Sequence, residues 1–246
     1  MLKRLFDIII SILGLLIFSP ILIPVMVIVY LQDYHSPFYV ANRVGLNHSL
    51  FKMVKLRSMI KNADKSGVAS TSANDNRITP IGQFIRKYKL DEVTQLWNVL
   101  IGDMSLVGPR PNVKQEVDIY TNEESRLLST KPGITDLASI VFSDEGDILR
   151  NQSDPDLAYN QLIRPWKSKL GLIYIDNSSI ILDIKLLFLT GVAIVSKANA
   201  LKSIQNILKK LNAPTDVINV SLRSNELVPS PPPGSDEVIM ELPYRS

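Results

Sequence analysis

"KYKLDEVTQLWNVLIGDMSLVGPRP", residues 87–111, combines an apolar repeat, two adjacent acids and an arginine between prolines. The repeat predicts an amphipathic helix that stops at Gly102. Its apolar positions are Leu90, Val93, Leu96, Trp97, Leu100 and Ile101. The acids, Asp91 and Glu92, fall in the first turn, and Arg110 follows the helix. The stretch therefore places two carboxylates and a guanidinium around one short helix.

The two acids have two interpretations. Acids in a first turn interact favourably with the helix dipole, which is worth about 0.3 to 1 kcal/mol. Alternatively they carry chemistry. Adjacent helical residues diverge by about 100°, so Asp91 and Glu92 cannot share one proton but can serve two partners in one cleft. One could attack or bind metal while the other moves a proton.

Arg110 lies in "GPRP", where two prolines restrict the backbone and would hold the guanidinium in a fixed direction. Bidentate phosphate recognition requires that geometry, although a surface arginine in a proline-rich turn would look the same. Further cations stand nearby in the sequence, each of which could equally be a solvated charge: Lys55, Arg57, Arg86, Lys87 and Lys89. Together with the acids they indicate phosphate chemistry with a divalent cation.

Composition narrows the classes of protein. The 246 residues suit one domain, or one domain with an appendage. No cysteine is present, which excludes disulfides, thiolate metal sites and a cysteine nucleophile, and the two histidines cannot form a metal site alone. The 27 basic and 24 acidic residues give a net charge of only +3, so nucleic acid is not indicated.

Residues Ile8 to Tyr30 carry no charge. As a helix they would span about 34 Å, against roughly 30 Å for the hydrocarbon core of a bilayer, so we expect a membrane segment. A cleaved signal peptide would also begin with basic residues, but this stretch is too long and lacks a small-residue cleavage site. Ser19-Pro20 and Pro24 lie in its middle, where proline removes a helix hydrogen bond, and should kink it.

Splitting the segment at Pro20 leaves two pieces of about 16 and 15 Å, each close to half the bilayer. Basic residues stand on both sides, Lys3 and Arg4 before it and Arg43 to Arg57 after it. The positive-inside rule then places both ends in the cytoplasm, which favours a re-entrant segment over a spanning one. Irregular backbone at this depth must be satisfied again, for instance by Ser19.

The rest of the chain reads as a small hairpin and several helices. Residues 38–60 predict a hairpin with turn signals at Gly45 and Asn47, and residues 155–176 predict a helix interrupted at Pro165. Residues 180–195 predict an apolar helix that lies either in the membrane surface or on the core. An amphipathic helix from residue 200 leads into "VPSPPPG", which predicts a flexible tail.

The sequence "LDEVTQLWNVLIGDMSLVGPRP", residues 90–111, closely resembles the hallmark "LDELPQLWNVLxGDMSLVGPRP" of the bacterial sugar transferases, the monotopic phosphoglycosyl transferases. A motif of this length is highly specific. The resemblance covers roughly residues 1–197 and includes "KRLFDIIIS", "SPILIP", "KPGIT" and "LDIKLLFLT". It does not cover the tail.

The resemblance implies transfer of a sugar-1-phosphate from a UDP-sugar to polyprenol (undecaprenyl) phosphate, with release of UMP, to initiate bacterial surface-glycan assembly. By this resemblance, Asp91 is the nucleophile that holds the phosphosugar and binds Mg²⁺, and Glu92 is a base or positions the acceptor. The resemblance implies that Arg110 binds a phosphate. Lys55, Arg57 and Arg86 are further phosphate-binding candidates because of their charge and their place in the sequence. Lys3 and Arg4 match a basic pair near the lipid phosphate, and Ser19-Pro20 matches the break of the re-entrant helix.

We therefore expect an α/β, predominantly helical monotopic membrane protein with a small hairpin and interfacial amphipathic helices. The expected domains are a membrane anchor at 1–34, a catalytic domain at 35–199 on the cytoplasmic face of the bacterial inner membrane, and a C-terminal helix and tail at 200–246. Two departures stand out: Thr94 replaces a usual proline, and "ITDLASI" at 134–140 replaces "ITGWAQV", which leaves the sugar open. An inactive scaffold for other glycan-assembly enzymes, and a homodimer, stay open as well.

Overall fold

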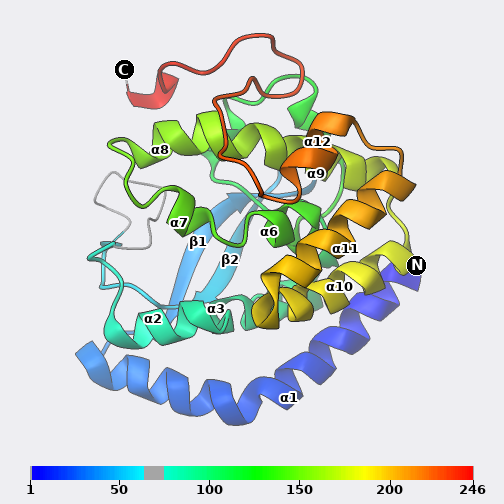
Figure 1. The fold of residues 1–246 in the computed structure, drawn as a ribbon. Helices are drawn as coiled ribbons and strands as arrows, with labels where there is room; N and C mark the ends of the chain where they lie inside the picture. The colour runs from blue at the N-terminus through cyan, green and yellow to red at the C-terminus, as the bar shows by residue number, and fades with distance from the viewer. Residues whose placement is uncertain (1, 64–74, 246) are drawn as a thin grey trace.

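The structure is a computed structural model that describes residues 2–63 and 75–245. It is mostly helical, with two small two-stranded sheets (Figure 1). The strands are β1 (Phe38–Val44), β2 (Leu50–Leu56), β3 (Ser105–Val107) and β4 (Gly133–Thr135). The α-helices are α1 (Leu2–Asp33), α2 (Pro80–Lys87), α3 (Leu90–Val93), α4 (Leu96–Ile101), α5 (Lys114–Val117), α6 (Leu137–Val141), α7 (Glu145–Ile148), α8 (Pro155–Ala158), α9 (Arg164–Asp176), α10 (Ile180–Val195), α11 (Lys197–Lys210) and α12 (Thr215–Val220).

The predicted hairpin is confirmed. Strands β1 and β2 pair antiparallel and are joined by a short helical turn, η1 (Leu46–His48), where Asn47 and His48 have positive φ. The pairing of β3 with β4, which is parallel, was not predicted. A side chain at Gly133 would meet the backbone nitrogen of Gly108 at 2.1 Å, so glycine is required for this close approach. The second pair brings the chain around Arg110 against residues 131–135.

The predicted helix over residues 90–101 is divided into α3 and α4. The Thr94 hydroxyl donates to the carbonyls of Asp91 (3.0 Å) and Val54 (3.3 Å), and Asn98 exchanges hydrogen bonds with the β2 backbone. These bonds fasten both short helices to β2. Gly102 ends α4 with φ 99°, as expected, but Trp97 and Ile101 are each 54% exposed and do not belong to the core.

Helix α1 is continuous through Pro20 and Pro24 and bends in its middle, where it lies along the lower edge of the domain (Figure 1). The predicted break is therefore a bend within one helix. Pro20 has no N–H for the carbonyl of Leu16, and the Ser19 hydroxyl donates to that carbonyl at 2.8 Å instead. The hydroxyl of Ser19 thus compensates for the missing bond, as expected from the sequence.

The first turns of α1 are fixed to the domain by polar contacts. Lys3 pairs with Asp183 of α10, and Arg4 donates to the last carbonyls of α4, Val99 and Leu100. Asp7 is 3% exposed and accepts hydrogen bonds from the Ser105 hydroxyl (2.9 Å) and the Leu106 amide (3.1 Å). The helix start is therefore bound to α4, α10 and β3.

The end of α1 is fixed to the same domain. Arg57 of the β2 end pairs with Asp33 and donates to the carbonyl of Val29 at 3.1 Å. Apolar packing supports the ion pair through Leu22, Val25, Val29, Leu56, Ile85 and Leu90. Both ends of α1 consequently rest on one domain, and the helix between them presents an apolar outer face. Exposed there are Ile9, Ile12, Leu13, Leu16, Ile17, Phe18, Ile21, Ile23, Val27 and Ile28.

Helix α10 packs on the core, which is one of its two predicted positions, and it also has an exposed apolar face. Leu182, Leu186 and Leu189 are buried in the core, whereas Ile181 and Phe188 are exposed on the opposite face. The exposed side chains of α10, with Trp97 and Ile101 of α4, add apolar surface to that of α1. Among the described residues, α1 alone is long and apolar enough to cross a membrane.

The C-terminal part differs from the flexible tail that the sequence predicts. Leu201, Ile204 and Leu208 of α11 and Val217 of α12 belong to the main core. Residues 221–245 then run back along the domain and end beside α8, at the edge opposite α1 (Figure 1). Backbone and side-chain hydrogen bonds hold this segment, so the proline-rich composition forms an ordered extended strap rather than a free linker.

Replacing Asp7 with alanine should loosen the start of α1, because the buried Ser105 hydroxyl and Leu106 amide would lose their acceptor. We expect Asp7→Ala to lower the free energy of unfolding by about 1 to 3 kcal/mol. Guanidinium denaturation in detergent, followed by tryptophan fluorescence, measures this. Ile9→Ala, on the exposed face, is the matched control and should stay near wild type. Equal free energies of unfolding for Asp7→Ala and Ile9→Ala would contradict the attachment of α1 through Asp7.

Candidate active site

The acid pair lies at the start of α3, which packs against β2. Glu92 accepts a hydrogen bond from Arg110 at 3.0 Å, and its carboxylate is 3.8 Å from the Lys89 ammonium group. Lys89 itself has positive φ (55°) and turns the chain from α2 into α3. The half-buried Asp91 carboxylate accepts no hydrogen bond from the part of the chain that the structure describes. One acid of the pair is therefore held and the other is free.

Electrostatics separate the two acids further. Burial raises the pKa of Asp91, and the Lys55 charge offsets only part of this effect. Burial also acts to raise the pKa of Glu92, but the charges of Arg110, Lys89 and Lys55 outweigh it and the pKa is lowered. The Glu92 charge in turn raises the pKa of Arg110. Glu92 and Arg110 thus form a lasting ion pair.

Two further predicted cations lie beside the acids. Burial, together with the charge of Arg110, lowers the pKa of Lys55 to about 8, and the Lys55 charge acts on both acids. The Arg86 guanidinium donates to the Ser58 hydroxyl at 2.9 Å and feels the charge of Asp91. The structure therefore brings Lys55, Arg86 and Arg110 to the acid pair, as the sequence predicts.

The structure gives three other predicted residues different partners. Arg57 was expected to bind phosphate, but it is buried and its guanidinium is bound to Asp33 and to backbone carbonyls. Lys3 and Arg4 were expected near the lipid phosphate, but they bind Asp183 and the end of α4. All three fasten α1 to the domain, because each binds an acceptor across the contact between the helix and the domain. Of the cations predicted to bind phosphate, Lys55, Arg86 and Arg110 are the ones that lie beside the acid pair.

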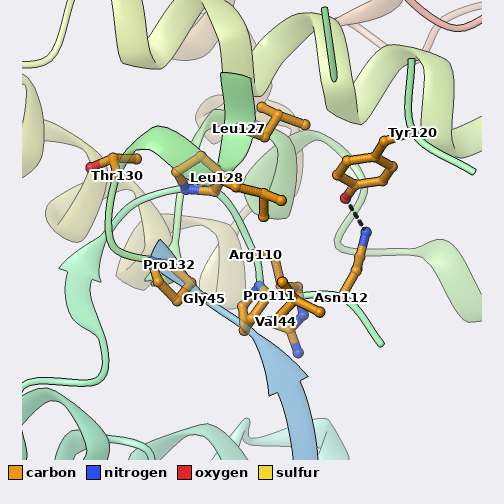
Figure 2. Close-up of a pocket in the computed structure, with 11 residues that line it drawn as sticks. Val44, Gly45, Arg110, Pro111, Asn112, Tyr120, Leu127, Leu128, Thr130 and Pro132 are labelled. Carbon is orange, nitrogen blue, oxygen red and sulfur yellow. Dashed lines mark hydrogen bonds between the residues drawn. The ribbon is translucent and has the colours of Figure 1, made fainter. Parts of the chain in front are cut away.

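Arg110 also borders two hollows. Figure 2 shows the first, of about 250 Å³, between the end of β1 and residues 127–132, with Asn112 donating to the Tyr120 hydroxyl at 2.8 Å. The second encloses about 440 Å³ of space that is partly open to solvent. It is lined by Pro109, Arg110, Asn112, Tyr120, Leu127, Asp136, Ala138, Ser139, Tyr159, Arg164, Lys167 and Ser168.

Among the charged groups around the second hollow, the sequence singles out only Asp136, as part of "ITDLASI"; Glu145, Arg164 and Lys167 were not among the predicted site residues. Lys167 forms an ion pair with Glu145 and lies 5.2 Å from the centre of the Tyr159 ring. The negative charge of Glu145 also acts to raise the pKa of Arg110. Asp136 begins α6 and accepts a hydrogen bond from the Ser139 amide at 2.7 Å. These residues come from separate elements with no fixed spacing, so only the tertiary structure brings them together.

The sequence is similar to known proteins over most of its length. The family described as bacterial sugar transferase matches residues 1–197. The exopolysaccharide production protein ExoY of Sinorhizobium fredii is 39% identical over 153 residues, which cover 56% of this chain and 68% of that protein. The undecaprenyl-phosphate galactose phosphotransferase of Salmonella typhimurium is 36% identical over 214 residues, 81% of this chain and 41% of that protein.

A third relative is the UDP-N-acetylgalactosamine-undecaprenyl-phosphate N-acetylgalactosaminephosphotransferase of Aeromonas hydrophila, 32% identical over 169 residues, or 67% of this chain. The chain spans about two fifths of the length of the Aeromonas and Salmonella proteins. On one domain, the described residues place an acid pair beside cations, together with one long apolar helix. The chain belongs to the bacterial sugar transferase family.

The lowered pKa of Lys55 predicts a pH dependence of phosphate binding. Lys55 is a cation below about pH 8 and loses its proton above it, so the affinity for the phosphate of UMP should fall as the pH rises. Lys55→Arg keeps its charge and should bind UMP without this decline. Calorimetric titration between about pH 7 and 9.5 compares the two. If the UMP affinities of wild type and Lys55→Arg changed with pH in parallel, Lys55 would not be the cation that binds the phosphate.

Proposed function

We propose that the protein transfers a sugar-1-phosphate from a UDP-sugar to polyprenol phosphate, releasing UMP. Membership of the bacterial sugar transferase family supports this, as do relatives whose names describe sugar phosphate transfer to undecaprenyl phosphate. The observation that carries the proposal is the arrangement of the acid pair. Glu92 is bound to Arg110, whereas Asp91 has no hydrogen-bond donor among the described residues and lies within the field of Lys55.

In the first step, an oxygen of Asp91 attacks the β-phosphorus of the UDP-sugar. A bond forms between that oxygen and phosphorus, and the bond from phosphorus to the bridging oxygen breaks. UMP departs with the electron pair, and the sugar phosphate is left on the Asp91 carboxylate. Lys55 and Arg110 stabilise the negative charge that develops on the leaving phosphate, because both are held beside the acids before the donor arrives.

In the second step, a phosphate oxygen of the lipid attacks the same phosphorus and displaces the Asp91 carboxylate. The product is a polyprenyl diphosphate sugar, and Asp91 returns to its starting form. Glu92 positions the incoming phosphate through the Arg110 guanidinium that it holds. Dividing the transfer into two displacements means that the two bulky substrates never have to be bound together.

A magnesium ion would fit this site at Asp91. Mg²⁺ is commonly held by one or two carboxylates and substrate phosphates, and retains several waters. The free Asp91 carboxylate supplies such a ligand, and residues 2–63 and 75–245 contain no group of three or more acidic, histidine or cysteine side chains that could hold a metal alone. When bound, the ion would neutralise charge on the phosphates of the donor.

We also infer that α1 enters the membrane from the cytoplasmic face and returns to it. Its two ends bind one domain, its middle bends, and its exposed face between them is apolar. A straight span would separate Lys3 from Asp33 by the bilayer thickness, which neither ion pair permits. Asp91 then lies close to the depth at which a lipid phosphate emerges, because α3 packs on α1.

The reaction is tested by UMP release from purified protein with magnesium and undecaprenyl phosphate. The donors tested are UDP-galactose, UDP-glucose and UDP-N-acetylgalactosamine. We expect release with one donor, loss of about a thousandfold or more in Asp91→Asn, and partial activity in Glu92→Gln, where Arg110 is retained. Membrane-bound, folded wild type that releases UMP from no UDP-sugar would refute the proposal and favour a scaffold role.

The topology of α1 is tested with single cysteines, since the sequence has none. Leu2 (69% exposed) and Tyr34 (72% exposed) flank the helix, and Val228 marks the domain. We expect cysteines at all three positions to resist a membrane-impermeant maleimide in intact spheroplasts and to react in inverted vesicles. Labelling of position 2 and position 34 on opposite sides would show a spanning helix.

A further inference from the structure

The C-terminal strap, residues 221–245, lies outside the region that matches the family. It runs from α12 across the domain and ends beside α8, away from α1 (Figure 1). Pro232, Pro233 and Leu242 of the strap are nevertheless buried, and several hydrogen bonds hold it. These contacts bind the C-terminal strap to particular residues of the domain.

Part of the surface that the strap contacts is the π-helical turn η4 (Tyr159–Ile163), between α8 and α9. The Ser230 amide donates to the Gln161 carbonyl at 3.0 Å, and the Gln161 side chain donates to the Ile239 carbonyl at 2.8 Å. The strap thus binds Gln161 from two sides. A π turn has poorer geometry than an α-helix and is often found at functional sites, so external bonds of this kind help to define its conformation.

The strap also forms hydrogen bonds with Thr121 and Glu116. The Thr121 hydroxyl donates to the Pro233 carbonyl, and Gly234 packs on Thr121. The Tyr244 hydroxyl donates to Glu116 at 2.8 Å, and Glu116 also faces the Asn160 amide. The strap therefore joins residues 116 and 121 to residue 161, which is distant from them in the sequence.

Residues next to those that the strap contacts line the second hollow. Tyr120 precedes Thr121, Tyr159 belongs to the turn that contains Gln161, and Arg164 binds Asn160 at 3.1 Å. Arg164 lies 5.4 Å from the Tyr120 ring centre and is bound through two nitrogens to the buried Glu124. One wall of the hollow is thus backed by the strap, and Arg110, which binds Glu92 of the acid pair, also lines the hollow.

We propose that the strap, through Gln161 and Thr121, positions the Tyr120–Tyr159–Arg164 wall of a donor-binding pocket, so that residues outside the family region set the affinity for the UDP-sugar. This inference rests on the proposed function, because it takes the hollow beside Arg110 as the site of the donor. The aromatic rings and polar groups of the wall suit a uridine or sugar moiety. Gln161 and Thr121 are positioning residues that act through their neighbours.

The test shortens the chain to end at Asn225, which keeps α11 and α12 in the core and removes the strap bonds. Loss of these hydrogen bonds should raise the KM for the UDP-sugar and weaken UMP binding about tenfold or more. Gln161→Ala, which removes one bond, should raise both about threefold. We expect kcat and the KM for undecaprenyl phosphate to stay within about twofold, because Asp91 and α1 are untouched.

Val228→Ala is the matched control, since Val228 belongs to the strap but is 64% exposed. Unchanged UMP affinity in both the shortened chain and Gln161→Ala, with wild-type turnover, would overturn the proposal. A fall in melting temperature with no change in UMP affinity would overturn it too. If the shortened chain does not fold, Gln161→Ala alone decides. Wild type without turnover on any donor would contradict the proposed function instead, a separate result.

Discussion

The structure depends on the attachment of α1 to one domain at both ends. Lys3, Arg4 and Asp7 fix the start of the helix, and Asp33 fixes its end through Arg57. A helix of 32 residues is about 48 Å long when straight, so the bend at Pro20 and Pro24 is what allows both attachments to form on one domain. The position of the acid pair depends on this attachment, because α3 and α4 pack against the bent helix.

The candidate site shows how one helical turn gives two carboxylates different environments. Fastening of Thr94 and Asn98 to β2 sets the direction of α3 beside Lys55. Glu92 is engaged in an ion pair with Arg110, and this pair holds the Arg110 guanidinium in place. Arg110 itself lies between two prolines. Asp91 remains as a carboxylate surrounded by cations but bound to no donor among the described residues, an arrangement that suits attack on a phosphate ester.

Local patterns predicted much of this structure. The turn signals gave the hairpin, the apolar length gave α1, and the motif around Asp91 and Arg110 gave the centre of the site. Local patterns did not predict the positions of side chains that depend on contacts between residues distant in the sequence. Trp97 has core periodicity but faces outward, Arg57 lies beside Asp33 because of the bend, and Glu145 meets Lys167 only in the fold. The proline-rich tail is ordered because Gln161, Thr121 and Glu116 supply partners that its own composition does not reveal.

The assignment of Asp91 as the residue that holds the sugar phosphate is the central claim. Its most direct test is the intact mass of the protein after brief exposure to the donor without undecaprenyl phosphate, followed by peptide mapping. The account predicts a mass increase of one sugar phosphate, located on the peptide that contains Asp91 and removed by the lipid acceptor. Turnover with no such adduct, or an adduct that persists in Asp91→Asn, would contradict it.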